Sequence, residues 1–104
     1  MSKIVFKCQL KNSIQNSDCI CLVDEKIWRD LSKSSRTKTL CVVRMIANGA
    51  SFFSFGGKII KCNSSLVRFR IGRSLRLVLL RKKESLVFNL FYRQGYEKYF
   101  KSIN

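Results

Sequence analysis

Basic side chains recur at close intervals in residues 66–81, among branched aliphatic residues that favour β-strands. These side chains belong to Arg68, Arg70, Arg73, Arg76 and Arg81. Residues two apart in a strand point to the same face, so Arg68 and Arg70 form a cationic face opposite Val67, Phe69 and Ile71. Guanidinium groups pair with phosphate oxygens through two parallel hydrogen bonds, so this pattern indicates a phosphate-binding surface.

Arg93, Tyr96 and Tyr99 follow the next aliphatic segment, residues 86–92. A tyrosine can stack on a base or transfer a proton, so these residues extend the candidate site for RNA. The alternative is that the arginines are solvated on an open sheet and that the tyrosines line an amphipathic tail. Since several arginines gather without compensating carboxylates, the pattern favours a binding site.

The chain has no histidine, which removes the usual general base and the usual zinc ligand. Its five cysteines show no repeated spacing, and Cys19 and Cys21 form the only close pair. We interpret the cysteines as small apolar core residues and expect no metal and no cofactor. Any catalysis must therefore use lysine, arginine, tyrosine or one of the few carboxylates.

The hydrophobic pattern predicts a single α+β domain over residues 1–104. An N-terminal strand at 2–7 precedes a helical hairpin, and an antiparallel three-stranded meander follows. The first helix spans about 24–33, and the second begins at a serine N-cap and ends at Asn48 and Gly49. The meander strands are expected at 66–71, 75–81 and 86–92. Residues 12–23 cannot be typed, 49–65 read as a loop with a short extended piece, and 94–102 as a short helix or an extended tail.

The composition suits one cytosolic domain that binds a polyanion. Apolar residues make up 46% of the 104 residues, which is enough for one core, and 21 Lys and Arg against 6 Asp and Glu give a net charge of +15. No apolar run approaches the roughly 20 residues of a membrane helix, and the N-terminus lacks a signal-peptide core. We therefore expect a cytoplasmic protein that makes no membrane contact.

The segments VRFRIGRSLRLVLL and SLVFNLFYRQGYEKYF, preceded by IWRDLSKSSRTKTL, resemble the RelE/ParE superfamily of toxins from toxin–antitoxin systems. The resemblance covers most of the chain in order. It implies a small microbial-RNase-like sheet with an N-terminal strand, two helices and a meander. It also implies an endoribonuclease, an mRNA interferase that inhibits translation by cutting mRNA on the ribosome. RelE-type toxins need no metal, because the ribose 2′-hydroxyl attacks the adjacent phosphate.

The resemblance also assigns site residues. Arg68 and Arg70 match the two basic strand positions, Arg76 the arginine after the turn, and Arg93 the arginine that ends the last strand. Tyr99 matches the terminal tyrosine, with Tyr96 as the alternative.

RelE has lysines where this chain has Arg68 and Arg70, and an arginine is a poor general base. Leu75 also replaces the aromatic residue that usually precedes the arginine of the second meander strand. The base must therefore lie elsewhere or the catalysis is mainly electrostatic. The candidate bases are Lys58, Lys61 and the two tyrosines, because neighbouring cations lower the pKa of such groups. Further RNA contacts are expected from Lys58, Lys61, Arg73 and Arg81.

Three functions remain open from the sequence. The first is the endoribonuclease, with mRNA and the ribosome as partners. The second is a ParE-like inhibitor of DNA gyrase on the same fold, and the third is a non-catalytic RNA- or ribosome-binding protein. In each toxin case the resemblance and the charge imply an acidic antitoxin protein as partner.

Overall fold

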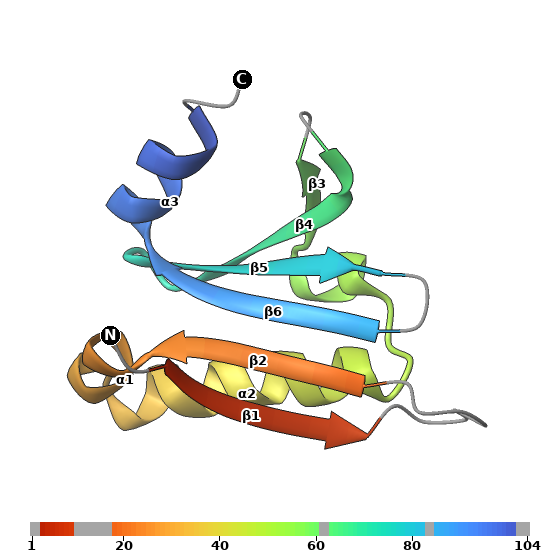
Figure 1. Cartoon of the computed structure of the whole chain (residues 1–104), viewed down its shortest axis with the longest axis horizontal. Coiled ribbons are helices and arrows are strands. Elements are labelled where there is room, and N and C mark those ends of the chain that lie inside the picture. Colours follow the sequence, from red (N-terminus) through yellow and green to blue (C-terminus); the bar gives the residue numbers. More distant parts are fainter. Residues whose placement is uncertain (1–2, 10–17, 61–62, 83–84, 102–104) are drawn as a thin grey trace.

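The structure is a computed structural model that describes residues 3–9, 18–60, 63–82 and 85–101 (Figure 1). Its elements are, in order, β1 (Lys3–Gln9), β2 (Asp18–Asp24), α1 (Glu25–Asp30), α2 (Lys33–Ala47), the 3-10 helix η1 (Phe52–Phe55), β3 (Lys58–Ile60), β4 (Asn63–Ile71), β5 (Leu75–Arg81), β6 (Ser85–Tyr92) and α3 (Arg93–Lys101). None of the helices in these ranges is long and apolar enough to cross a membrane.

The strands form one sheet in the order β1-β2-β6-β5-β4-β3. Neighbouring strands pair antiparallel except β2 and β6, which pair in parallel. The predicted α+β class, the N-terminal strand and the meander are confirmed. The sheet is larger than expected, because β2 lies in the segment that could not be typed and β3 adds a short edge strand. The strand that leads into the helices is therefore β2.

The two helices of the predicted hairpin are capped by side chains that the sequence places before them. Asp24 accepts a hydrogen bond from the Lys26 amide at 2.8 Å, and Ser32 accepts one from the Ser35 amide at 3.1 Å. Each cap satisfies an amide that has no partner within its helix. α2 ends at Asn48 and Gly49, where Gly49 has a φ of 95°.

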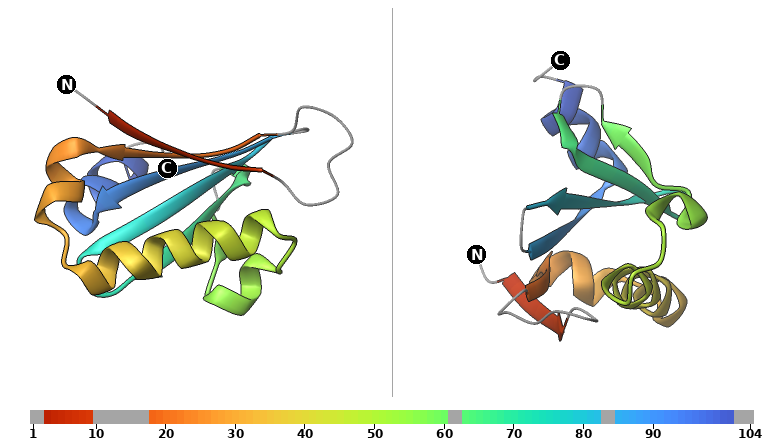
Figure 2. Two further views of the ribbon diagram at one scale, coloured as in Figure 1. Left: turned by 90° about the horizontal axis from the view of Figure 1, so that it is seen from below. Right: turned by 90° about the vertical axis from the view of Figure 1, so that its right-hand side faces the viewer.

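The main core lies between α2 and one face of the sheet. Figure 2 (left) shows α2 running along this face beneath the strands. Val43 and Ile46 of α2 pack there with the alternating apolar residues of the central strands. On β4, β5 and β6 these residues are Val67, Phe69, Ile71, Leu75, Leu77, Leu79, Phe88 and Leu90.

The opposite face carries a smaller apolar cluster. Val78 and Ile60 are buried in it, and Leu66, Phe91 and Tyr96 pack against them. Tyr96 belongs to α3, which spans residues 93–101. The tail is therefore a short helix, one of the two alternatives that the sequence left open. The apolar strands of the meander are thus covered by α2 on one side and partly by α3 on the other.

Gly57 is buried where the backbone of η1 passes over β4, and we expect Gly57→Ala to destabilise the protein. A Cβ would lie 2.7 Å from the Phe52 carbonyl oxygen and 2.9 Å from Phe69 Cε1. Such overpacking typically costs about 1–3 kcal/mol. Urea unfolding would measure the loss, with Gly95→Ala as the matched control. An added Cβ at Gly95 meets nothing within 4 Å, and alanine favours a helix interior by roughly 0.5–1 kcal/mol. Equal stability of the two variants would contradict this account.

Candidate nucleic-acid interface

The strand register brings basic side chains from three strands to the sheet face that also carries α3. Arg70 of β4 lies directly opposite Arg76 of β5, and Lys58 of β3 lies opposite Arg68 of β4. These positions alternate with the buried residues that face α2, so all four side chains lie on the other face. Lys58 and Arg70 are exposed, whereas Arg76 is only 7% exposed.

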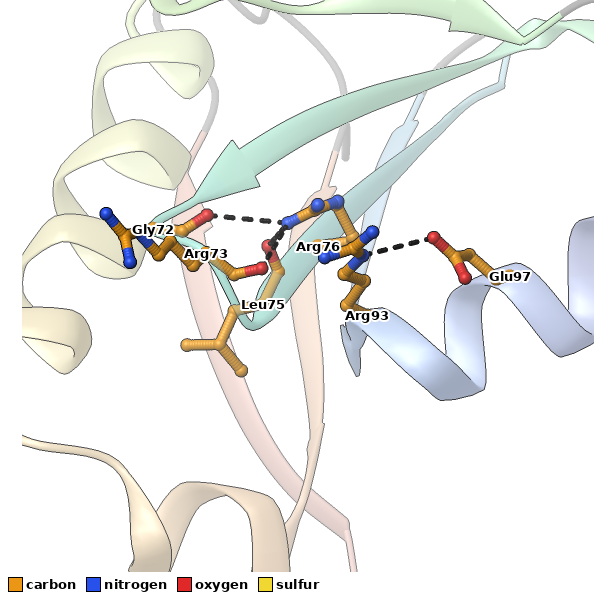
Figure 3. Close-up of polar contacts among 6 residues, drawn as sticks. All are labelled: Gly72, Arg73, Leu75, Arg76, Arg93 and Glu97. Atoms are coloured by element: carbon orange, nitrogen blue, oxygen red, sulfur yellow. Dashed lines mark hydrogen bonds and ion pairs between the residues drawn. The ribbon is translucent and has the colours of Figure 1, made fainter.

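Arg76 is held by the turn that joins β4 to β5. Its Nη1 donates to three backbone carbonyls of this turn, those of Gly72, Arg73 and Leu75, at 3.4, 3.3 and 2.8 Å (Figure 3). Gly72 has a φ of 73°, in the left-handed region that glycine adopts without strain. The turn therefore fixes the position of a buried cation beneath the exposed arginines.

The cations of this face are close enough to repel one another. Burial lowers the pKa of Arg76, and Arg70, Arg68 and Arg93 lower it further. The Glu97 carboxylate raises the pKa of Arg76, but its contribution is smaller than that of burial or of any of the three arginines. Such an accumulation of positive charge favours binding of a polyanion, which would relieve the repulsion.

Arg93 begins α3 and is tied to the same turn. Its amide donates to the Ser74 carbonyl at 2.7 Å, and its Nε donates to Glu97 at 3.1 Å. Its side chain stays 58% exposed despite this ion pair. Figure 3 shows its guanidinium beside that of Arg76, whereas Arg73 points away from them. The guanidiniums of Arg76 and Arg93 thus come together from β5 and α3.

Tyr96 lies on the same face, half-buried against the cluster of Ile60 and Val78. We name the set Lys58, Arg68, Arg70, Arg76, Arg93 and Tyr96 the cationic face. Tyr99 belongs to α3, but its side chain lies outside the described part of the structure, as does the whole of Lys61.

Two arginines of the predicted set lie elsewhere. Arg81 occupies the face of β5 that carries α2, where its Nη2 donates to the Ser64 carbonyl. Its guanidinium lies 5.0 Å from the centroid of the Phe52 ring, and its Nε is buried without a partner. Arg73, in the β4–β5 turn, borders a cavity of about 420 Å³ that Arg93 also lines. Arg81 is therefore placed to stabilise η1 against β4, and Arg73 is placed beside the cationic face.

Sequence reasoning missed Tyr92, the last residue of β6. It is 39% exposed, and its hydroxyl donates to Asp30 of α1 at 3.5 Å. Burial and the Asp30 carboxylate raise its pKa, so the hydroxyl stays protonated and serves as a donor. Its position directly before Arg93 in the sequence could have indicated a role for Tyr92. Its contact with α1 could be known only from the three-dimensional structure.

We expect Arg70→Gln to stabilise the folded protein. Arg70 lies directly opposite Arg76, and like charges in such a pair are destabilising by up to about 1 kcal/mol. Removal of one charge should therefore raise Tm by a few degrees at low salt, and added salt should shrink the difference. Thermal unfolding at two salt concentrations would measure this effect, with the exposed helical variant Arg44→Gln as control. A lower Tm for Arg70→Gln would show that the repulsion is already compensated.

Within the described residues, no group of three or more His, Cys, Asp or Glu side chains could hold a metal ion. The model of the ParE-like toxin domain family matches residues 33–98, which is more than half of the chain. The chain belongs to the ParE-like toxin domain family. No curated protein and no solved structure matches the chain.

The ParE-like toxin domain runs from the start of α2 into α3, so it contains every residue of the cationic face. Membership makes the protein a toxin of the kind found in toxin–antitoxin systems, which typically pairs with an antitoxin. It also confirms the resemblance to the RelE/ParE superfamily that the meander motifs indicated. β1, β2 and α1 lie before the matched residues.

Proposed function

We propose that this ParE-like toxin is a metal-independent, ribosome-dependent endoribonuclease that cleaves mRNA in the cytoplasm. The observation that carries the proposal is the cationic face, in which four arginines, a lysine and a tyrosine meet with Glu97 as the carboxylate that acts on Arg76. A chain without histidine must rely on other side chains for proton transfer and charge stabilisation. The cationic face supplies lysine, arginine and tyrosine, which this reaction can use. No metal or cofactor enters the mechanism.

The reaction requires three kinds of group around one phosphodiester. A base removes the proton of the ribose 2′-hydroxyl, whose oxygen attacks the phosphorus atom and displaces the 5′-oxygen of the next nucleotide. An acid protonates that leaving oxygen, and cations stabilise the charge on the phosphate. The products are a 2′,3′-cyclic phosphate and a free 5′-hydroxyl.

The cationic face offers a candidate for each role. Lys58 is the base in our proposal, because it is exposed beside Arg68 and, unlike an arginine, can lose its proton. Arg68, Arg70 and Arg93 would bind the phosphate, and Arg76 would add positive charge from beneath. Tyr96 or Tyr99 of α3 would protonate the leaving oxygen.

The test is cleavage of a defined mRNA, with and without programmed ribosomes, followed by primer extension to map new 5′ ends. We expect cuts at fixed codon positions only with ribosomes and only with the intact cationic face. Absence of cuts under both conditions would contradict the nuclease proposal.

Inhibition of DNA gyrase is the second candidate function. It is favoured by the replacement of the RelE lysines by Arg68 and Arg70 and by the ParE-like description of the matched family. A supercoiling assay separates the two proposals, since a gyrase inhibitor should block supercoiling and leave mRNA intact. RNA binding without cleavage, measured on the same mRNA, would indicate the non-catalytic alternative.

We also propose that the antitoxin is acidic where it contacts this toxin. The net charge of +15 and the mutual repulsion of the arginines around Arg76 favour a partner that brings carboxylates to the cationic face. Such a partner would exclude RNA from the same surface.

A further inference from the structure

The cavity beside the cationic face lies at the end of the sheet, between the β4–β5 turn and the junction of β6 with α3. Arg73, Ser74, Tyr92, Arg93 and Gln94 line it, and its volume is about 420 Å³. Ordinary small-molecule sites span roughly 300–1,000 Å³, so the cavity is large enough for one ligand of moderate size. The bond from the Arg93 amide to the Ser74 carbonyl at 2.7 Å joins its two walls.

The lining combines groups that suit a nucleotide. Arg73 of the β4–β5 turn and Arg93 of α3 both line the cavity, and both side chains are exposed. Tyr92 presents a partly exposed ring whose hydroxyl is directed to Asp30 of α1. An aromatic ring next to an arginine is the usual combination by which proteins bind single-stranded nucleic acid, with the base on the ring and the phosphate on the cation.

Arg93 connects this cavity with the cationic face. It lines the cavity, and its positive charge also lowers the pKa of Arg76. Arg93 therefore borders both, so a chain of nucleotides with one phosphate at Arg93 can place its next nucleotide in the cavity.

We propose that the cavity between Arg73 and Tyr92 is a subsite for the nucleotide next to the scissile phosphate, in single-stranded RNA. The base stacks on the Tyr92 ring, and the flanking phosphate contacts Arg73. This inference rests on the proposed function, because it extends the same RNA path. Tyr92 and Arg73 are binding residues in this arrangement and take no part in the proton transfers.

The test uses an RNA trinucleotide with 2′-O-methyl riboses, which cannot be cleaved, and a 5-iodouridine at one end or the other. Irradiation with the purified toxin should crosslink one of the two probes to the peptide that contains Tyr92, as identified by mass spectrometry. Fluorescence polarisation of a labelled trinucleotide and dinucleotide gives the contribution of the added nucleotide to affinity.

Tyr92→Leu should lose the crosslink and weaken trinucleotide binding by roughly 5- to 150-fold, the range expected for one lost base stack. Tyr92→Phe keeps the ring and should retain both. Phe53→Leu removes a 64% exposed ring on η1 and should change neither. Arg73→Ala should weaken binding, whereas Arg44→Ala, with the same change in charge on α2, should not.

Equal crosslinking and affinity in wild type and Tyr92→Leu, with Tm values that show both folded, would overturn the subsite and leave the nuclease proposal standing. Absence of binding by any oligonucleotide, combined with absence of mRNA cleavage, would overturn both. Crosslinking at Tyr92 by a free nucleotide as strongly as by the trinucleotide would also overturn the proposal, because it would indicate a site independent of the RNA chain.

Discussion

Replacement of Arg70 and Arg93 by alanine in one protein is expected to slow mRNA cleavage at least about 10³-fold while the fold remains intact. Removal of a single donor to a developing charge costs about 10²–10³-fold in turnover, and an arginine at a transferring phosphoryl group is worth more. Arg70 is exposed and the Arg93 side chain is 58% exposed, so neither change leaves a buried group without a partner. Rates of ribosome-dependent cleavage under single-turnover conditions would measure the effect, with circular dichroism to confirm folding.

Arg76→Ala is not a suitable variant for testing catalysis, because Arg76 also has a structural role. Arg76 donates to three turn carbonyls and is 7% exposed, so its removal would disturb the β4–β5 turn. The loss of buried hydrogen bonds costs about 1–3 kcal/mol and would be confused with a loss of catalysis. The matched control for the Arg70 and Arg93 double variant is Arg29→Ala with Arg44→Ala. It also removes two positive charges, but from exposed positions on the helices. Normal cleavage by the Arg70 and Arg93 double variant would exclude the cationic face as the active site.

The second large effect is expected from Lys58→Arg, which should lower the cleavage rate by about 10²–10⁴-fold. This is the usual contribution of a general base, and an arginine keeps the positive charge but cannot accept the 2′-hydroxyl proton. The variant therefore separates the charge of residue 58 from its basicity. RNA binding should be unchanged, so the loss should lie in kcat alone.

Cleavage rates measured side by side over a range of pH provide the decisive measurement. Lys58→Arg should stay far below wild type at every pH tested. Lys38→Arg, at an exposed position of α2, is the matched control and should behave as wild type. If Lys58→Arg retains the full rate and pH profile, the base is another group, and Tyr96→Phe becomes the next variant.

The helices and the meander could be predicted because their signals are local. Ser32 and Asn48 mark the ends of α2, and the alternation of β4 and the turn at Gly72 define the hairpin with β5. β2 could not be predicted, because Cys19–Val23 is a short apolar run with no alternation to separate strand from helix. Its state is decided by pairing with β1 on one side and β6 on the other.

The sequence alone could have shown that the two arginines of β5 lie on opposite faces of the sheet. Arg76 and Arg81 are five residues apart, so in a regular strand their side chains point to opposite faces. The position of Lys58 could not be derived in this way. It depends on the pairing of β3 with β4, and β3 is a three-residue strand whose register shifts after Ile59.

The parallel pairing of β2 with β6 also bears on when the sheet that carries the cationic face can be completed during synthesis. Asp18 pairs with Ser85, so these two neighbouring strands of the sheet are separated by most of the chain. Contacts of this range fold slowly, because a long loop must close before any of them forms. Arg93 and Tyr96 follow β6 and lie still later in translation. A nascent chain on the ribosome therefore carries an incomplete cationic face until almost all of the described residues have emerged, so the site that we propose cannot form earlier in synthesis.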